Sequence, residues 1–171
     1  PGSPPPRKCK RFSSAKKVMA SVFWDAEGIL MIDYLQRGQT ITGQYYAQEL
    51  RQLREAIKEK RRGKLRAGVI LLQDNAPVHN SQIAVTTAAE CGFELLPHPP
   101  YWPDVAPSDF FLFPNLKSYL RGHLYETDDD VMTAVEAYMR GKDTTFFSEG
   151  IQKLERRWAK CVELKGDYVE K

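Results

Sequence analysis

Cysteine is scarce in this sequence, and the few cysteines present form no recognisable pattern. There are three in 171 residues, at positions 9, 91 and 161. They are odd in number and far apart, and none is in a Cys-x-x-Cys pair or a zinc-ligand spacing. This argues against a disulfide-stapled fold and against a zinc module. It favours a reducing compartment in which the thiols are buried or idle.

Long apolar runs are also missing. No stretch approaches the roughly 18 residues that a membrane-spanning helix needs, so no membrane partner is expected. The first residue is proline and not methionine, and no apolar leader segment follows it. We therefore expect the chain to be a fragment, a processed product or a trimmed form of a longer protein.

The composition is that of a folded domain with a basic arm. Hydrophobic residues make up 42% and charged residues 27% of the chain, which suits one globular domain of this length. The net charge is +3, but residues 1–17 are proline-rich and carry six cations and no acid, which leaves the remainder acidic. These cations are Arg7, Lys8, Lys10, Arg11, Lys16 and Lys17. We divide the chain into an arm, 1–17, and a domain, 18–171.

Hydrophobic periodicity and turn residues predict an alternation of strands and helices. The expected elements are a hairpin over 18–35, a helix from Thr42 to Gly63, a strand at 69–72, a helix at 81–91, a strand at 93–96, a helix capped by Ser108, a helix opening at Thr127 and a helix over 144–161. The apolar run at 69–72 is typical of a strand buried on both faces. This order predicts an α/β fold with a mixed sheet flanked by helices.

Asp74 is the first candidate for a functional residue. It directly follows the apolar strand, and ligands gather at the carboxyl ends of strands in α/β sheets. A residue in this place also commonly caps the next turn, so both roles stay open. Asp109 follows with 34 residues between, at the predicted start of a helix after a proline-rich segment. Two carboxylates placed in this way could converge on Mg²⁺ or Mn²⁺.

Two segments make a resemblance specific. QDNAPVHNSQ and LLPHPPYWPDVAPSDFFLFPNLK resemble the catalytic domain of mariner-type transposases of the Tc1/mariner superfamily, in both motif contexts and in their spacing. The likeness also runs through VFWDAEGIL, GQTITGQYYAQEL and GIQKLERRWAKCVELKGDYVEK, so it covers essentially the whole chain.

The resemblance implies a ribonuclease H-like fold, with a five-stranded mixed sheet flanked by helices. It further implies that three acids hold two divalent metal ions, Mg²⁺ or Mn²⁺, for DNA cleavage and strand transfer at transposon ends in the nucleus. Asp74 matches the second acid and Asp109 the third. The arm at 1–17 is similar to a family segment that reaches the partner subunit of a homodimer and DNA. With the family accepted, the second cationic cluster, Lys60, Arg61, Arg62 and Lys64, is also expected to contact phosphates.

One family feature has no counterpart in this sequence. The first acid, which stands in a D-E-K-W-like context on the opening strand, is not matched, and neither is its strand. Asp25 is interpreted as a turn residue and Asp33 as a strand residue, so neither replaces it. We therefore expect DNA cutting by this chain alone to be weak or absent. His79 is expected to hydrogen-bond within the turn after the strand, or else to lie beside the metal site. Trp102 stands where the family has serine, and Asp104 is interpreted as a turn cap.

Two further hypotheses remain open from the sequence. The chain could be a non-catalytic module, such as a domesticated one, that binds DNA or a protein through its basic arm. It could also be a structural oligomerisation module. The metal-dependent enzyme is the leading hypothesis because both acid contexts match together.

Overall fold

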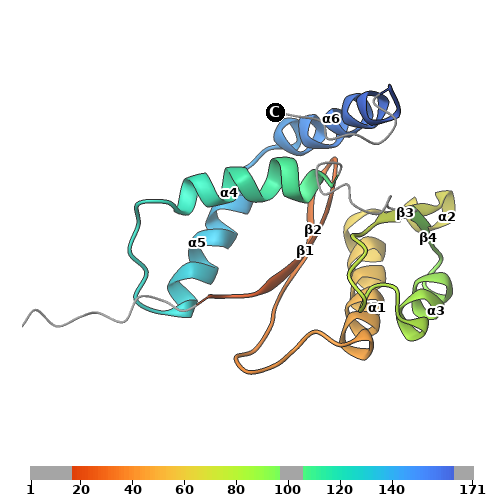
Figure 1. Cartoon of the computed structure of the whole chain (residues 1–171), viewed down its shortest axis with the longest axis horizontal. Coiled ribbons are helices and arrows are strands. Elements are labelled where there is room, and N and C mark those ends of the chain that lie inside the picture. The colour runs from red at the N-terminus through yellow and green to blue at the C-terminus, as the bar shows by residue number, and fades with distance from the viewer. Residues whose placement is uncertain (1–16, 97–105, 164–171) are drawn as a thin grey trace, which may run out of the picture.

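The computed structural model describes residues 17–96 and 106–163, as a set of helices around two small sheets (Figure 1). The strands are β1 (Ala20–Asp25), β2 (Gly28–Tyr34), β3 (Val69–Leu72) and β4 (Phe93–Leu96). The helices are α1 (Gly43–Lys60), α2 (Lys64–Ala67), α3 (Gln82–Glu90), the π-helix η2 (Ser108–Leu112), α4 (Phe113–Leu120), α5 (Asp128–Arg140) and α6 (Thr144–Glu163).

The hairpin formed by β1 and β2 contains a bulge that determines which side chains face which core. Phe23 pairs with Met31, but Trp24 pairs with Ile29, so Leu30 is an extra residue on β2. A bulge places its extra residue outside the regular alternation of faces. Leu30 and Met31 consequently both pack into the same core. The carbonyl oxygen of Leu30 accepts a hydrogen bond from the Lys60 ammonium group, at 2.7 Å.

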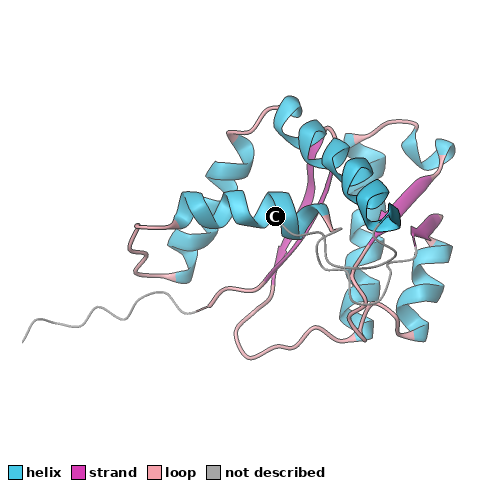
Figure 2. Cartoon of the chain, turned by 45° about the horizontal axis from the view of Figure 1, so that its top comes forward, coloured by secondary structure: helices cyan, strands magenta, loops and turns pink. Residues whose placement is uncertain are grey.

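The hairpin separates two hydrophobic cores. One core lies against α1, α3 and the β3–β4 pair, and the other against α4, α5 and α6, as the arrangement in Figure 1 shows. Neighbouring residues of β1 point into different cores, since side chains alternate along a strand. Phe23 joins the first core, whereas Val22 and Trp24 join the second. Figure 2 shows the same two strands passing between the two groups of helices.

Helix α1 begins and packs as its sequence predicts. Thr42 is the N-cap, and its hydroxyl accepts the backbone N–H of Tyr45 at 3.1 Å. The apolar residues that recur at helical spacing are buried: Tyr46, Leu50, Leu53 and Ile57. The helices expected at 81–91 and from Thr127 are confirmed as α3 and α5. In the structure Ser81 caps α3, and Thr127 caps α5 in a capping box.

The strand β3 differs from its prediction. It pairs in parallel with β4, but Ile70 is 62% exposed, so the expectation of burial on both faces is wrong. Val69 and Leu71 face the first core, and the side chain of Ile70, between them in sequence, points the other way. Over the residues that the structure describes, the strands form two separate two-stranded sheets, where the family resemblance implies one five-stranded sheet.

The helix expected after Ser108 begins differently. Pro107 is the N-cap, and Ser108 is the first residue of the π-helix η2, which leads directly into α4. A wide π-helical turn is uncommon and is frequently found at functional sites. None of the helices in the described ranges combines the length and the apolarity needed to cross a membrane.

Glu49 is a carboxylic acid buried between α1 and the hairpin. It is 2% exposed, and neither of its carboxylate oxygens has a well-formed hydrogen bond within the described ranges. Burial raises the pKa of Glu49; the Ser21 hydroxyl offsets part of this, and the Asp33 carboxylate adds to it. A carboxyl whose pKa is higher in the folded state weakens stability as the pH rises from its unfolded value through its folded value.

We predict that Glu49→Gln stabilises the protein at pH 7 by roughly 1 kcal/mol, because the amide carries no charge to desolvate. The gain should shrink as the pH falls to about 4, the ordinary range for glutamate. Urea unfolding at both pH values measures it, with the exposed Glu59→Gln on the same helix as control. A less stable variant at pH 7 would mean that Glu49 is ionised and favourably paired.

Candidate active site

Asp74 lies in the turn that follows β3, and its position is set by local hydrogen bonds. The carboxylate is 58% exposed. Its Oδ1 accepts the backbone N–H of Ala76 at 3.0 Å and lies 2.6 Å from Nδ1 of His79. Because a carboxylate oxygen only accepts hydrogen bonds, His79 carries its proton on Nδ1. Asp74 thus caps its turn, one of the two roles that the sequence left open, while the carboxylate remains accessible.

A second layer of side chains holds His79 in place. The Gln73 amide donates to the backbone carbonyl of His79 at 3.3 Å, and the Tyr46 hydroxyl donates to Oε1 of Gln73 at 2.7 Å. The ring of Tyr46 lies 4.2 Å from the ring of His79 and 6.4 Å from that of Phe23 on β1. Burial, followed by the charges of nearby acids, raises the pKa of Tyr46, so its hydroxyl stays a neutral donor. The turn with Asp74 is therefore braced against α1 and β1.

Asp109 is the second residue of η2 and is exposed. Ser108, directly before it, and Phe111, two residues after it, are both anchored. The indole N–H of Trp24 donates to the Ser108 hydroxyl at 3.1 Å, and the side chain of Phe111 is buried. The Asn115 amide also donates to the carbonyl of Phe111 at 2.8 Å. The position of Asp109 follows from these contacts of Ser108 and Phe111.

Consecutive residues of β1 therefore support the two turns that carry the predicted acids. Phe23 packs toward Tyr46 and the Asp74 turn, and Trp24 binds the turn that begins η2. Asp25 and Asp33, the two acids of the hairpin, have other hydrogen-bond partners. Asp25 accepts hydrogen bonds from its own turn, and Asp33 accepts one from the Tyr45 hydroxyl. Within the described ranges no three His, Cys, Asp or Glu side chains are grouped so as to hold a metal ion.

The second predicted DNA-binding cluster lies beside the hairpin turn, where most of its cations already have protein partners. The guanidinium of Arg61 binds both carboxylate oxygens of Asp25, at 2.9 and 3.0 Å, and is 11% exposed. Lys64 pairs with Glu27 and lies 3.5 Å from Asp25. Lys60 donates to the hairpin, as described above.

The other cations predicted to bind DNA are either exposed or outside the described residues. Arg62 is exposed, and so is Lys17, the first described residue. The remaining arm cations, Arg7, Lys8, Lys10, Arg11 and Lys16, lie outside the described residues. The same holds for Trp102 and Asp104.

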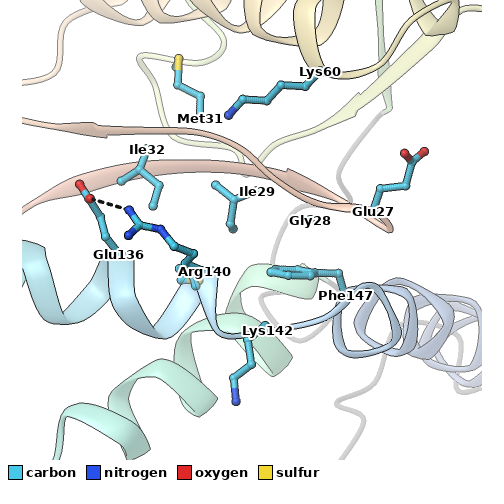
Figure 3. Close-up of a pocket in the computed structure, with 11 residues that line it drawn as sticks. Glu27, Gly28, Ile29, Met31, Ile32, Lys60, Glu136, Arg140, Lys142 and Phe147 are labelled. Atoms are coloured by element: carbon cyan, nitrogen blue, oxygen red, sulfur yellow. Dashed lines mark ion pairs between the residues drawn. The ribbon is translucent and has the colours of Figure 1, made fainter.

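An open pocket lies along the outer edge of β2, away from both predicted acids. Figure 3 shows Lys60 on one side of the strand and Arg140 and Phe147 on the other. Arg140 is paired with Glu136 at 3.9 Å. Neither Asp74 nor Asp109 lines this pocket, so it is no part of the candidate active site.

The sequence did not show that Trp24 and Tyr46 support the turns of Asp109 and Asp74. Trp24 and Tyr46 lie in apolar patterns that predict burial, but a pattern does not name the partner of a buried N–H or O–H group. A buried tryptophan or tyrosine usually has a polar partner, and that is the only signal that could have prompted a search for Ser108 and Gln73.

Comparisons with known proteins agree with the motifs. The family model described as "Transposase (partial DDE domain)" matches residues 1–67. The mariner Mos1 transposase of Drosophila mauritiana is 36% identical over 172 residues, which cover 99% of this chain and 50% of that protein. The histone-lysine N-methyltransferase SETMAR of Homo sapiens is 36% identical over 156 residues, which cover 91% of this chain and 23% of that protein.

Solved structures show the same likeness in three dimensions. The Mos1 transposase catalytic domain solved with raltegravir and Mn superposes with a TM-score of 0.86 at 36% identity, covering 91% of this chain and 78% of that one. A Mos1 paired-end complex with the left transposon end gives 0.85 at 35% identity, covering 99% and 50%.

The chain belongs to the family of mariner-type transposase catalytic domains, with a mixed α/β fold that matches the Mos1 catalytic domain. It spans half of the Mos1 transposase and about a quarter of SETMAR, the two curated relatives it matches.

Asp25, Glu27, Arg61 and Lys64 form an ion cluster at the hairpin turn. Two substitutions of Asp25 separate the effect of its charge from the effect of its hydrogen bonds to the turn. Burial alone would raise the pKa of Asp25, but the hydrogen bonds from Arg61 and from the Glu27 amide outweigh it and lower this pKa below its usual value. We predict that Asp25→Asn, which keeps an acceptor for the turn, destabilises by about 1 kcal/mol, and that Asp25→Ala destabilises by about 2–3 kcal/mol.

Urea unfolding at pH 7 measures both variants, with the exposed Asp129→Asn as control. Because the folded pKa is lowered, the stabilisation is complete above about pH 4 and is lost as the pH falls through the folded pKa. The variants should thus approach the parent protein in strong acid. An Asn variant as stable as the parent would show that the charge contributes nothing, and equal effects of Asn and Ala would show that the turn acceptor contributes nothing.

Proposed function

We propose that this chain is a catalytic domain for DNA cleavage and strand transfer, in which Asp74 and Asp109 hold Mg²⁺ or Mn²⁺. The observation that carries the proposal is the exposed carboxylate of Asp74, fixed by His79 at the end of β3. The second acid, Asp109, is likewise exposed on an anchored turn. Support comes from the Mos1 catalytic domain, whose solved structures contain Mg or Mn.

The donor atoms suit such ions, since carboxylate oxygens are the ligands that Mg²⁺ and Mn²⁺ prefer. When bound, a pair of metal ions activates the attacking oxygen and stabilises the leaving oxygen of a phosphodiester. The side chains of this chain have a positioning role. His79 and the Ala76 amide restrict the rotamer of Asp74, and Trp24, acting through Ser108, restricts the turn of Asp109.

The site needs more than these two acids. Within the described ranges no three His, Cys, Asp or Glu side chains are grouped so as to hold a metal ion, and β1 and β3 each have one edge without a strand partner there. We infer that a further strand, which carries another carboxylate, completes the sheet in the active enzyme. It follows that the 171-residue chain alone binds metal weakly and cuts DNA weakly or not at all.

The DNA substrate and the assembly are also proposals. Transposon-end DNA is the expected substrate, supported by the paired-end complexes of Mos1. A homodimer formed through the arm at 1–17 and a nuclear location are the remaining expectations for a DNA-cutting protein of this family.

A second candidate function is a non-catalytic module that binds DNA or protein. The observation that favours it is the similar segment in SETMAR, a protein whose name describes a histone-lysine methyltransferase and of which that segment is 23%. A domain of this family can therefore form a minor part of a protein named for another activity.

Isothermal titration with MnCl₂ tests the metal site. We expect binding in the millimolar range for the parent chain and its loss in Asp74→Ala and in Asp109→Ala, because each removes a carboxylate ligand. Asp129→Ala, which removes an exposed acid on α5, is the control. An unchanged titration in both ligand variants would refute the site and favour the non-catalytic module.

Plasmid nicking tests the incomplete site separately. With Mn²⁺, the 171-residue chain should convert little or no supercoiled DNA to the nicked form. Robust nicking that disappears in Asp74→Ala would contradict the inference that a further acid is required, while it would support Asp74 as a ligand.

His79 should affect metal affinity without being a ligand. Partners that hydrogen-bond a ligating carboxylate typically change metal affinity by 10- to 100-fold when they are removed. We therefore predict that His79→Ala weakens Mn²⁺ binding about 10-fold or more, and that His79→Asn, which keeps a short N–H donor, weakens it less. Equal binding by all three proteins would mean that the Asp74–His79 hydrogen bond does not organise the site.

A further inference from the structure

The middle of α6 presents a basic face next to the turn that carries Asp109. Four cations, Lys153, Arg156, Arg157 and Lys160, recur within two turns of this helix. At 100° per residue they lie on one side of it, whereas Glu155 lies on the other. Arg156 and Lys160 are exposed. We call these four residues the α6 basic face.

Two cations of this face pack on the aromatic residues that directly follow Asp109. The ammonium of Lys153 lies 4.6 Å from the ring centre of Phe111, and the guanidinium of Arg157 lies 4.4 Å from that of Phe110. An aromatic face attracts a cation and restricts its side chain. The basic face is thereby held within one turn of Asp109.

Close packing at Gly150 sets the position of α6. A Cβ atom at this residue would lie 2.5 Å from Cδ1 of Phe111 and 3.0 Å from the indole ring of Trp24. Only a residue without a side chain lets the helix come this near to η2 and β1. Phe111 and Trp24, which anchor the Asp109 turn, therefore also place the α6 basic face beside it.

The charges of this face contrast with those near the hairpin turn. There, Arg61 and Lys64 are paired with Asp25 and Glu27. The ammonium of Lys153, by contrast, contacts an aromatic ring, and this contact leaves its positive charge uncompensated. Besides Glu155 on the other side of the helix, α6 carries Glu149, four residues before Lys153, and Glu163, three residues after Lys160.

We propose that the α6 basic face binds the sugar-phosphate backbone of the DNA strand that lies at Asp109. The face from Lys153 to Lys160 extends about 10 Å along the helix axis, which corresponds to the rise of about three phosphates on one strand. Lysine and arginine contacts of this kind position DNA and read no sequence. The proposal rests on the proposed function, because it takes DNA as the substrate.

Fluorescence anisotropy with the full 171-residue chain and a labelled 30-base-pair duplex, without metal, tests this face between 50 and 200 mM salt. The variant is Lys153→Gln/Arg156→Gln/Lys160→Gln, which leaves Arg157 on its ring. We expect binding to weaken about 10-fold or more at 100 mM salt, and the slope of log K against log salt to decrease in magnitude by about 2–3, because each lost phosphate contact removes about 0.9.

The matched control, Arg51→Gln/Lys58→Gln/Arg140→Gln, removes the same number of exposed cations elsewhere and should retain the parent slope. If both triple variants bind alike, the basic face is refuted while the DNA substrate stands. If the parent chain binds no duplex at all, the proposed DNA substrate fails and the inference fails with it.

If the triple variant melts at a lower temperature than the parent, the single variants Arg156→Gln and Lys160→Gln test the face instead. Each should lower the magnitude of the slope of log K against log salt by about 0.9. Unchanged slopes would overturn the proposal.

Discussion

The structure depends on the bulged hairpin of β1 and β2, because both cores are built on its two faces. Phe23 and Trp24 are neighbours in sequence, yet the alternation of the strand sends one toward α1 and the other toward η2 and α6. The bulge at Leu30 adjusts β2 to this division. The turns with Asp74 and Asp109 are supported from these opposite faces. One hairpin therefore supports both turns that carry the candidate metal ligands.

Both acids are exposed, and an exposed carboxylate is not positioned by its own burial. Its rotamer depends on neighbours that are themselves packed. For Asp74 these neighbours lead through His79 and Gln73 to the buried Tyr46. For Asp109 they are Ser108 and Phe111. Catalytic groups generally need such support from rigid elements, and here it comes from residues that bring no reactive chemistry of their own.

Much of the fold could be predicted because helical and strand periodicities are local. The helix starts at Thr42, Ser81 and Thr127 were predictable for the same reason. The predictions failed where the outcome depends on distant residues. Ile70 lies in an apolar run like that of a fully buried strand, but its exposure depends on which strands pair beside β3. Likewise, Ser108 has the chemistry of an N-cap, but its hydroxyl accepts from Trp24 instead.

The sequence by itself determined the identity of the two acids, their spacing and the family, since these are properties of linear motifs. Only the tertiary structure decided which residues support the acids and which cations are already paired. The Tyr46–Gln73 bond joins residues 27 apart and the Trp24–Ser108 bond joins residues 84 apart. The sequence likewise could not show that Asp25 binds Arg61, or that α6 brings its cations to the Asp109 turn. Such contacts exist only after distant segments pack, because no local periodicity encodes them.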